Sequence, residues 1–248
     1  MSGSCGRRWE PRLGVLGGMG PLAGAACALR IVQLTSATRD QEHIAVVLLN
    51  DPHVPDRSSA YMAGGQSPLP AMLRGVNALV GAGADCIVVP CNTAHLWFDQ
   101  LQQACPRPIL HIVDAVIDDL RRRGIADGTV GVLGTPATLE LGLYQDRLVS
   151  SGYRPMIPRQ AEIQSLLVPA IAAVKANRVS EAYSSVARAI ESLGRRGARA
   201  IVLGCTELPL AVPHERRPEL GIVLTDSIDA LALQAIEWMN RYAGTCAA

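Results

Sequence analysis

The 248-residue chain is poor in aromatic residues, which make up 4% of it and include a single phenylalanine, Phe98. Proteins that bind single-stranded nucleic acid usually stack bases on aromatic side chains, so this scarcity argues against a stacking platform. The formal net charge of +1 gives no electrostatic reason to expect a nucleic acid or a membrane surface as partner. The sequence therefore predicts neither kind of partner.

No apolar run approaches the roughly 20 residues that a membrane-spanning helix needs. Residues 1–12 are polar and contain arginine, unlike a secretory signal, and we expect them to form a disordered tail in which Cys5 is incidental. The seven cysteines are odd in number and include no CxxC pair. That usage is typical of reduced thiols in a cytoplasmic protein rather than of a disulfide framework.

Apolar, β-branched runs alternate with amphipathic stretches along most of the chain, which is the pattern of a parallel α/β sheet. The strands that this pattern predicts are Leu13–Gly17, Ile44–Asn50, Asp85–Pro90, Ile109–Ile112, Thr129–Leu133, Ala200–Leu203 and Ile222–Leu224. The predicted helices are Leu22–Thr38, Pro70–Val80, Asp114–Arg123, Glu140–Ser150, Ile163–Ala176, Ser180–Leu193 and Ser227–Tyr242.

Two segments that contain a cysteine read as copies of one another. GADCIVVPCNT at residues 83–93 and GARAIVLGCTE at residues 197–207 match with an offset of 114, the distance between Cys91 and Cys205 (205 − 91). LGVLG and VGVLG, which end at Gly17 and Gly134, repeat with an offset of 117 (134 − 17). This duplication predicts two similar parallel-sheet α/β lobes, related by pseudo-twofold symmetry, with an active site in the cleft between them.

We place the first lobe at residues 13–115 together with about 221–248, and the second lobe at residues 116–220. Ligands of open parallel sheets bind beyond the carboxyl ends of the strands. Glycine or polar residues stand at five such ends: Gly17, Asn50, Cys91, Gly134 and Cys205. We therefore expect these strand ends to converge on one site.

Cys91 and Cys205 differ from the other cysteines because each follows a strand and precedes a polar helix start. Backbone N–H groups at a helix start lower the pKa of a thiol, and a pair of thiols that titrate near neutral pH suits acid–base catalysis. We interpret these two as catalytic. Cys27, Cys86 and Cys105 are interpreted as packing residues, because cysteine is among the most buried residue types.

A zinc ion is the competing use of Cys91, His95, Cys105 and His111. Their spacing matches no compact structural zinc pattern, so we predict no metal. His95 lies one helical turn beyond Cys91, where it either tunes the thiol as an imidazolium or is an ordinary polar residue.

The glycine-rich segment Gly17–Gly24 satisfies the dinucleotide-binding pattern. The acidic residue that such a fold needs at the end of its second strand is misplaced, because Asp40 and Glu42 precede that strand and Asp51 lies 31 residues after Gly20 (51 − 20). We expect the loop to offer backbone N–H groups to a smaller carboxylate ligand, with a plain βα turn as the alternative.

Two cations are candidates for carboxylate binding. Arg57 follows the proline-restricted loop Pro52–Pro55, and a guanidinium matches a carboxylate as a bidentate fork. Lys175 is the only lysine in the chain and therefore the only residue able to form a Schiff base with pyridoxal phosphate. Its expected mid-helix position favours a surface cation or a second carboxylate anchor instead.

Three segments, Gly17–Ala23, Pro90–His95 and Gly204–Leu208, resemble the signatures of the aspartate/glutamate racemase family. The resemblance extends from about residue 12 to the C-terminus. It implies two similar α/β lobes with the active site between them, a homodimer, and racemisation without pyridoxal phosphate or another cofactor, with one cysteine as base and the other as acid.

By that resemblance Cys91 and Cys205 are the catalytic thiols, Arg57 matches an arginine that binds a substrate carboxylate, and Lys175, which we also expect to bind substrate, matches the lysine found ahead of the second cysteine. The residues that fall where such enzymes line their pocket are Met19, Asn92, Thr93, Thr135 and Thr206.

We further expect Gly20 to bind substrate and His95 and Glu207 to be candidates for tuning the thiols. Two departures, Gly24 in place of a threonine and the apolar Ile171 one turn before Lys175, are expected to alter the pocket.

Residues and resemblance together predict a racemase that interconverts the L and D enantiomers of an acidic amino acid, aspartate first and glutamate next. A broad-specificity racemase, and a decarboxylase or cis–trans isomerase on the same scaffold, are the alternatives, and a non-catalytic amino-acid-binding protein is a third. Retention of both thiols favours racemisation, because the arylmalonate decarboxylases that resemble this scaffold keep only the second.

Overall fold

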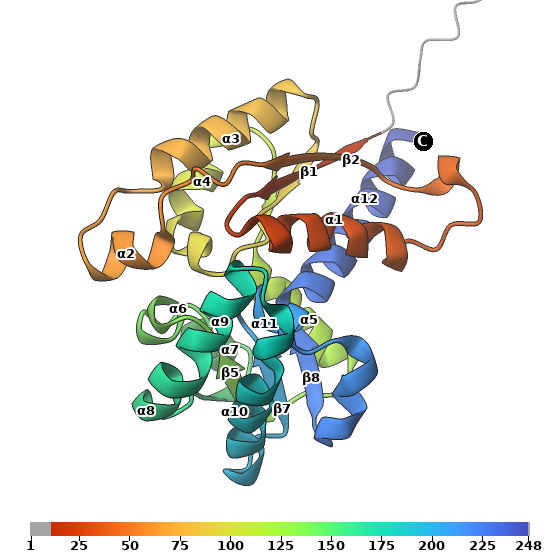
Figure 1. Ribbon diagram of the computed structural model, residues 1–248. Helices are drawn as coiled ribbons and strands as arrows, with labels where there is room; N and C mark the ends of the chain where they lie inside the picture. The colour runs from red at the N-terminus through yellow and green to blue at the C-terminus, as the bar shows by residue number, and fades with distance from the viewer. Residues whose placement is uncertain (1–10, 248) are drawn as a thin grey trace, which may run out of the picture.

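The computed structural model describes residues 11–247, so most of the expected tail, with Cys5, lies outside the described residues. The described residues form two parallel four-stranded sheets, one in each lobe (Figure 1). The strands are β1 (Arg12–Gly17), β2 (Ala45–Asn50), β3 (Cys86–Val88), β4 (Ile109–Leu110), β5 (Gly128–Leu133), β6 (Tyr153–Met156), β7 (Ala200–Leu203) and β8 (Val223–Asp226). This confirms the predicted α/β fold class.

Helices connect the strands. The α-helices between β1 and β5 are α1 (Pro21–Leu34), α2 (Arg57–Met62), α3 (Leu69–Gly81), α4 (Phe98–Ala104) and α5 (Ile112–Arg122). Those that follow are α6 (Pro136–Glu140), α7 (Gln145–Ser150), α8 (Gln160–Glu162), α9 (Val168–Lys175), α10 (Tyr183–Arg195), α11 (Leu208–Ala211) and α12 (Ser227–Ala247). Short 3-10 segments lie at Asp40–Glu42, Thr93–Trp97, Val179–Glu181 and His214–Leu220, and a π-helical turn at Ile163–Leu167 precedes α9.

The two sheets have the same strand order, which is the structural counterpart of the sequence repeat. The first runs β2-β1-β3-β4 and the second runs β6-β5-β7-β8. Cys91 lies just beyond β3 and Cys205 just beyond β7, the third strand of each lobe. Equivalent chain positions thus carry the two cysteines.

The lobes exchange their last helices. α5, which follows β4 of the first sheet, packs against α7 and β8 of the second lobe, whereas α12, which follows β8, packs against α1, β1, β3 and β4. Figure 1 shows α12 rising from the second lobe along the first. The strand expected to return to the first lobe, β8, pairs with β7 in the second sheet instead, so that part of the predicted first lobe is wrong.

Three local predictions need correction. The predicted helix Glu140–Ser150 is two helices, because Gly142 adopts a φ of +69° between α6 and α7. The loop expected to carry Arg57 instead leads into α2, which Asp56 caps by accepting a hydrogen bond from the Ser59 N–H at 2.7 Å. Arg12, placed in the tail, is the first residue of β1.

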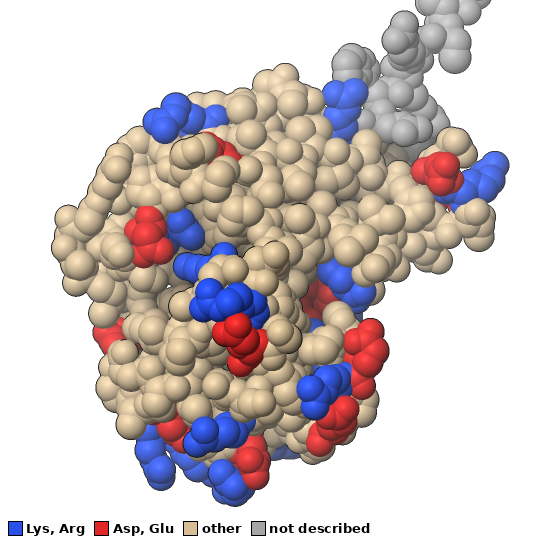
Figure 2. Space-filling view, viewed as in Figure 1, with Lys and Arg blue, Asp and Glu red and all other residues tan. Residues whose placement is uncertain are grey.

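The described surface carries charges of both signs in small groups, without a broad patch of one sign on the face in Figure 2. The outer face of α1 is apolar, with Leu22, Leu29 and Val32 all more than one-third exposed. Among the described residues, no helix is both long and apolar enough to cross a membrane.

Candidate functional site

One narrow pocket, with a cavity volume of ≈ 10 Å³, lies between the lobes at the carboxyl ends of both sheets. The residues that line it are Met19, Asp56, Arg57, Ser58, Cys91, Asn92, Thr93, Thr135, Lys175, Cys205, Thr206 and Glu207. Every residue predicted to bind or transform a substrate is in this set except Gly20.

Cys205 is buried, and its Sγ donates a hydrogen bond to Oε2 of Glu207 at 3.0 Å. Burial and the negative charge of Glu207 raise the pKa of the Cys205 thiol well above its usual range. The expectation that a helix start lowers this pKa is wrong, because α11 is only four residues long and a carboxylate stands beside the sulfur. Cys205 therefore rests as a thiol with a carboxylate in place to take its proton.

Cys91 is buried against the same pocket from the first lobe. Its neighbour Thr93 begins a 3-10 turn rather than an α-helix. The Thr93 hydroxyl lies 3.1 Å from the hydroxyls of both Thr135 and Thr138 of the second lobe, which are themselves 2.9 Å apart. This ring of three buried hydroxyls joins the two lobes beside the pocket.

Arg57 is 7% exposed, and its Nη1 donates to the carbonyl oxygens of Val54 and Pro55 at 3.1 and 3.0 Å. Its Nε is buried without a hydrogen-bond partner, and among residues 11–247 no carboxylate lies within 4.0 Å of its guanidinium. Asp56 is near enough for the charge of Arg57 to help lower its pKa, but it forms no ion pair with Arg57. A buried charge that is incompletely paired is costly, so Arg57 is placed to bind an anion at the pocket.

Lys175 enters the pocket from the second lobe as the last residue of α9, so the expectation of a mid-helix position is wrong. Its Nζ lies 3.8 Å from Oδ2 of Asp56, across the cleft. Burial raises the pKa of Asp56, but the backbone hydrogen bond from Ser59 and then the charge of Lys175 hold it below its usual value. Asp56 and Ser58 are pocket residues that the sequence analysis missed.

His95 lies outside the pocket and supports Cys91 from behind. Its Nδ1 donates to the Cys91 carbonyl at 2.9 Å, and its Nε2 accepts from the Ile112 N–H at 3.2 Å. Burial lowers the pKa of His95 to about 4, so the ring is neutral at pH 7. The interpretation of His95 as an imidazolium that tunes the thiol is therefore wrong, and the ordinary polar interpretation fits.

His111 packs edge-on against His95, with ring centroids 4.9 Å apart, and its Nδ1 accepts from the Val113 N–H at 3.1 Å. Burial and the neighbouring His95 lower the pKa of His111 to about 2. The zinc set of Cys91, His95, Cys105 and His111 is not among the groups whose ligand atoms come within 4.8 Å of one another in the described residues.

The two buried histidines predict acid-sensitive stability. Their pKa values of about 4 and about 2 lie below the value near 6.5 of a histidine in the unfolded chain. Below pH 6.5 these histidines are therefore protonated in the unfolded chain but stay neutral in the native state. Stability is then lost as pH falls, by about 2 kcal/mol per histidine at pH 5. Denaturant unfolding of the parent and of His111→Asn at pH 7.5 and 5 measures this. Asparagine can keep the cap of α5, so between pH 7.5 and 5 His111→Asn should lose about 2 kcal/mol less free energy of unfolding than the parent. An equal loss in both proteins would contradict the account.

The glycine-rich loop is shaped by close packing. Gly18 has a φ of +91°, and a Cβ there would overlap the backbone of Asp51. Gly24 is packed so tightly that a Cβ would lie 2.6 Å from Oδ1 of Asn50 and 2.9 Å from Cα of Gly17. Gly24 and the buried Ile171 do not line the pocket, so their expected effect on it is not direct.

Gly20, predicted to bind substrate, instead caps α1 beside the pocket, and a Cβ on it would lie 3.4 Å from Oε1 of Glu207. That oxygen is buried without a hydrogen-bond partner. Cys27, Cys86 and Cys105 are buried free cysteines outside the pocket, as their interpretation as packing residues required.

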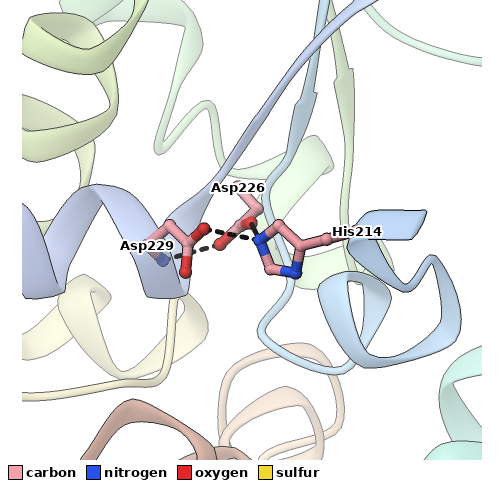
Figure 3. A group of neighbouring side chains, drawn as sticks. All are labelled: His214, Asp226 and Asp229. Carbon is pink, nitrogen blue, oxygen red and sulfur yellow. Dashed lines mark hydrogen bonds and ion pairs between the residues drawn. The ribbon is translucent and has the colours of Figure 1, made fainter. Parts of the chain in front are cut away.

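Within the part of the chain that the structure describes, one group of three side chains has the spacing of a metal site: His214, Asp226 and Asp229, whose ligand atoms lie within 4.8 Å of one another (Figure 3). Two arginines already neutralise its carboxylates. Arg30 Nε lies 2.5 Å from Asp229 Oδ1, and Arg217 Nη1 lies 2.6 Å from Asp226 Oδ2. We interpret the group as a network of ion pairs.

Comparison with known proteins agrees with this geometry. The family model described as Asp/Glu/Hydantoin racemase matches residues 16–235. An aspartate racemase of Picrophilus torridus superposes with a TM-score of 0.82 and 31% identity, covering 93% of this chain and 94% of that chain. A broad specificity amino-acid racemase of Bacillus subtilis, RacX, is 27% identical over 236 residues, covering 93% of this chain and 99% of that protein.

A glutamate racemase of Deinococcus radiodurans is 33% identical over 171 residues, covering 68% of this chain and 58% of that protein. The relatives thus differ in the substrates that their names give, although they share the scaffold. The chain belongs to the Asp/Glu/hydantoin racemase family and is an isomerase of that family.

Proposed function

We propose that the protein interconverts L- and D-aspartate, and less readily glutamate, by proton transfer between Cys91 and Cys205 without a cofactor. The observation that carries this proposal is that thiols from the two lobes line one small pocket together with two cations. A thiol on each side of a planar intermediate can remove the α-proton from one face and return a proton to the other.

The resting protonation of Cys205 gives it the role of acid in one direction of the reaction. Cys91, which must be a thiolate in this direction, removes the α-proton, and Cys205 protonates the carbanion from the opposite face, so that Cys91 ends as the thiol and Cys205 as the thiolate. In the reverse direction Cys205 must first lose its proton, and Glu207 is 3.0 Å away to accept it. Glu207 is therefore the tuning residue in this proposal.

The developing negative charge needs fixed donors, because the proton is removed next to a carboxylate. Arg57, with its unpartnered buried Nε, and the hydroxyls of Thr93 and Thr206 are our candidates.

Lys175 offers a second positive charge at the opposite side of the cleft. The pocket lining also holds the carboxylates of Asp56 and Glu207, so Lys175 must exchange its contact with Asp56 for one with a substrate carboxylate. The two cations are the basis for placing aspartate and glutamate, which have two carboxylates, first.

The test is incubation of the purified chain, without added cofactor, with each enantiomer of aspartate, glutamate and alanine, followed by chiral chromatography. We expect aspartate to racemise fastest and alanine slowest. Alanine turnover equal to that of aspartate would support a broad-specificity racemase, the function named for the similar Bacillus subtilis protein. Release of CO₂ or cis–trans isomerisation without inversion would overturn the proposal.

Glu207→Gln should lower kcat/KM for racemisation by about 100-fold, because the amide accepts no proton from Cys205. The loss must be equal in both directions, since the equilibrium constant between two enantiomers is one. At fixed pH, iodoacetamide should alkylate Cys205 faster in Glu207→Gln than in the parent, because removal of the negative charge of Glu207 lowers the pKa of the Cys205 thiol.

Mass spectrometry of the alkylated chain gives the rate for each cysteine. Glu162→Gln is the matched control, because Glu162 also accepts a hydroxyl hydrogen bond, from Ser192, and lies outside the pocket. Parental racemisation in Glu207→Gln, or slower alkylation of Cys205, would show that Glu207 has no such role.

The homodimer implied by the family resemblance remains a prediction. Light scattering of the purified chain would test it directly.

A further inference from the structure

Tyr144 is the largest of the fully buried side chains among the described residues, and it contacts the neighbours of both pocket cysteines. It directly precedes α7 in the second lobe. Its hydroxyl donates to Oδ1 of Asn92 at 2.6 Å, and Asn92 directly follows Cys91 in the first lobe. One hydrogen bond thus ties the second lobe to the residue beside the first thiol.

The ring of Tyr144 also packs on Gly204, which directly precedes Cys205. A Cβ on Gly204 would lie 2.9 Å from Cε2 and 3.3 Å from Cζ of Tyr144. The ring therefore occupies the space that a side chain at residue 204 would need. It packs against the backbone next to the second thiol, while its hydroxyl holds the side chain of the residue next to the first.

A second route joins the same two strand ends. Nδ2 of Asn92 donates to Oγ of Ser227 at 2.9 Å, and that hydroxyl donates to the carbonyl of Leu203, the last residue of β7, at 3.1 Å. Ser227 begins α12 directly after Asp226, which is held by the ion pair with Arg217. Asn92 is thus clamped between Tyr144 and Ser227.

Burial raises the pKa of the Tyr144 phenol well above its usual value. The hydroxyl therefore remains a hydrogen-bond donor at neutral pH. It does not touch the pocket, so it takes no part in proton transfer itself.

We propose that Tyr144 is a positioning residue that sets the separation of the Cys91 and Cys205 thiols across the cleft. The effect of Tyr144 on the rate of racemisation rests on the proposed function, whereas its contacts beside the two cysteines do not depend on that function. A thiol pair that must hold an α-carbon between its two sulfurs is sensitive to spacing, and a displacement of about 1 Å can cost 10²-fold in rate. Loss of the hydroxyl leaves Oδ1 of Asn92 without its partner in a buried position, which favours a shift of that strand end.

The test compares Tyr144→Phe with Tyr153→Phe. Tyr153 is also buried in the second lobe, its hydroxyl donates to the Ile125 carbonyl at 2.7 Å, and it does not line the pocket. Each variant removes one buried hydroxyl, and because that of Tyr153 also interacts with Arg121, Tyr153→Phe should lose at least as much thermal stability as Tyr144→Phe. We expect Tyr144→Phe to lower kcat by about 10–100-fold with KM within about threefold of the parent. We expect Tyr153→Phe to change neither by more than about twofold, since its hydroxyl braces no pocket residue.

A readout that does not need turnover separates this inference from the proposed function. Iodoacetamide alkylation of Cys91 and Cys205, followed by mass spectrometry, should be faster in Tyr144→Phe than in the parent for both thiols and unchanged in Tyr153→Phe. If the parent racemises no amino acid, the proposed function fails while the alkylation comparison still decides the positioning role.

Parental kcat together with parental alkylation rates in Tyr144→Phe would overturn the proposal. Equal losses of kcat in the two tyrosine variants would also overturn it, because they would reflect stability alone. If Tyr144→Phe does not fold, Ser227→Ala removes the other hydrogen bond of the clamp, and the same loss of kcat and faster alkylation are expected of it.

Discussion

Cys91→Ala and Cys205→Ala each lower racemisation by about 1,000-fold or more and leave the chain folded, if the two thiols share the proton transfer. Both side chains are small and lie at a pocket, so their loss opens no large cavity in the core. The remaining thiol still faces one side of the substrate. Each variant should therefore exchange the α-proton of one enantiomer with solvent without inverting it.

Chiral chromatography measures inversion, NMR in D₂O measures exchange, and circular dichroism reports the fold. Cys105→Ala is the matched control, because Cys105 is a buried free cysteine of the first lobe that does not line the pocket. The control should racemise at close to the parental rate. Near-parental inversion in either Cys91→Ala or Cys205→Ala would exclude the two-thiol mechanism.

Arg57→Ala should lower kcat/KM for aspartate by about 100–1,000-fold while leaving the free energy of unfolding nearly unchanged. The guanidinium is 7% exposed, its Nε has no hydrogen-bond partner and no carboxylate of the described residues lies within 4.0 Å of it, so its removal should cost the fold little. A substrate carboxylate pairs with that guanidinium, and loss of one partner of a buried charge pair costs about 2–5 kcal/mol. Activity should thus fall without a matching loss of stability.

Denaturant unfolding and steady-state kinetics measure the two effects on the same variant. Arg57→Lys keeps the charge but loses the fork that matches a carboxylate, so it should recover only part of the activity. Alanine as substrate distinguishes the two carboxylates: if Arg57 binds the side-chain carboxylate, Arg57→Ala leaves alanine turnover unchanged. A loss of stability that parallels the loss of activity would show that Arg57 is structural.

The elements that the sequence predicted are those whose pattern is local. The apolar runs that became β1, β5 and β7 were placed correctly because buried parallel strands are continuously apolar. β6 was missed because it contains Arg154 and Pro155, residues that an edge strand of the sheet tolerates.

The sheet to which β8 belongs was mispredicted for a different reason. Pairing between β7 and β8 depends on how the chain crosses between lobes, which no residue pattern records. The exchange of α5 and α12 between the lobes has the same origin.

Most of the pocket followed from the duplicated cysteine segments and the family resemblance, because those residues stand next to strand ends. The electrostatics did not follow. The sequence predicted a lowered thiol pKa at a helix start, but the buried carboxylate of Glu207 beside Cys205 has the opposite effect. Tyr144 and Ser227 carry no local signal, and only the packing of the two lobes brings them to Asn92.

The central claim is that two different thiols handle the proton on the two faces of the substrate. The most direct test is racemisation of L-aspartate in D₂O at low conversion, with the α-hydrogen of residual substrate and of product measured separately by mass spectrometry after chiral separation. Both thiols exchange with solvent before turnover, so the account predicts deuterium in the D-aspartate formed and protium in the L-aspartate that remains. The same must hold from the D enantiomer. Protium carried into the product, or deuterium appearing in residual substrate as fast as in product, would mean that one group serves both faces and would contradict the account.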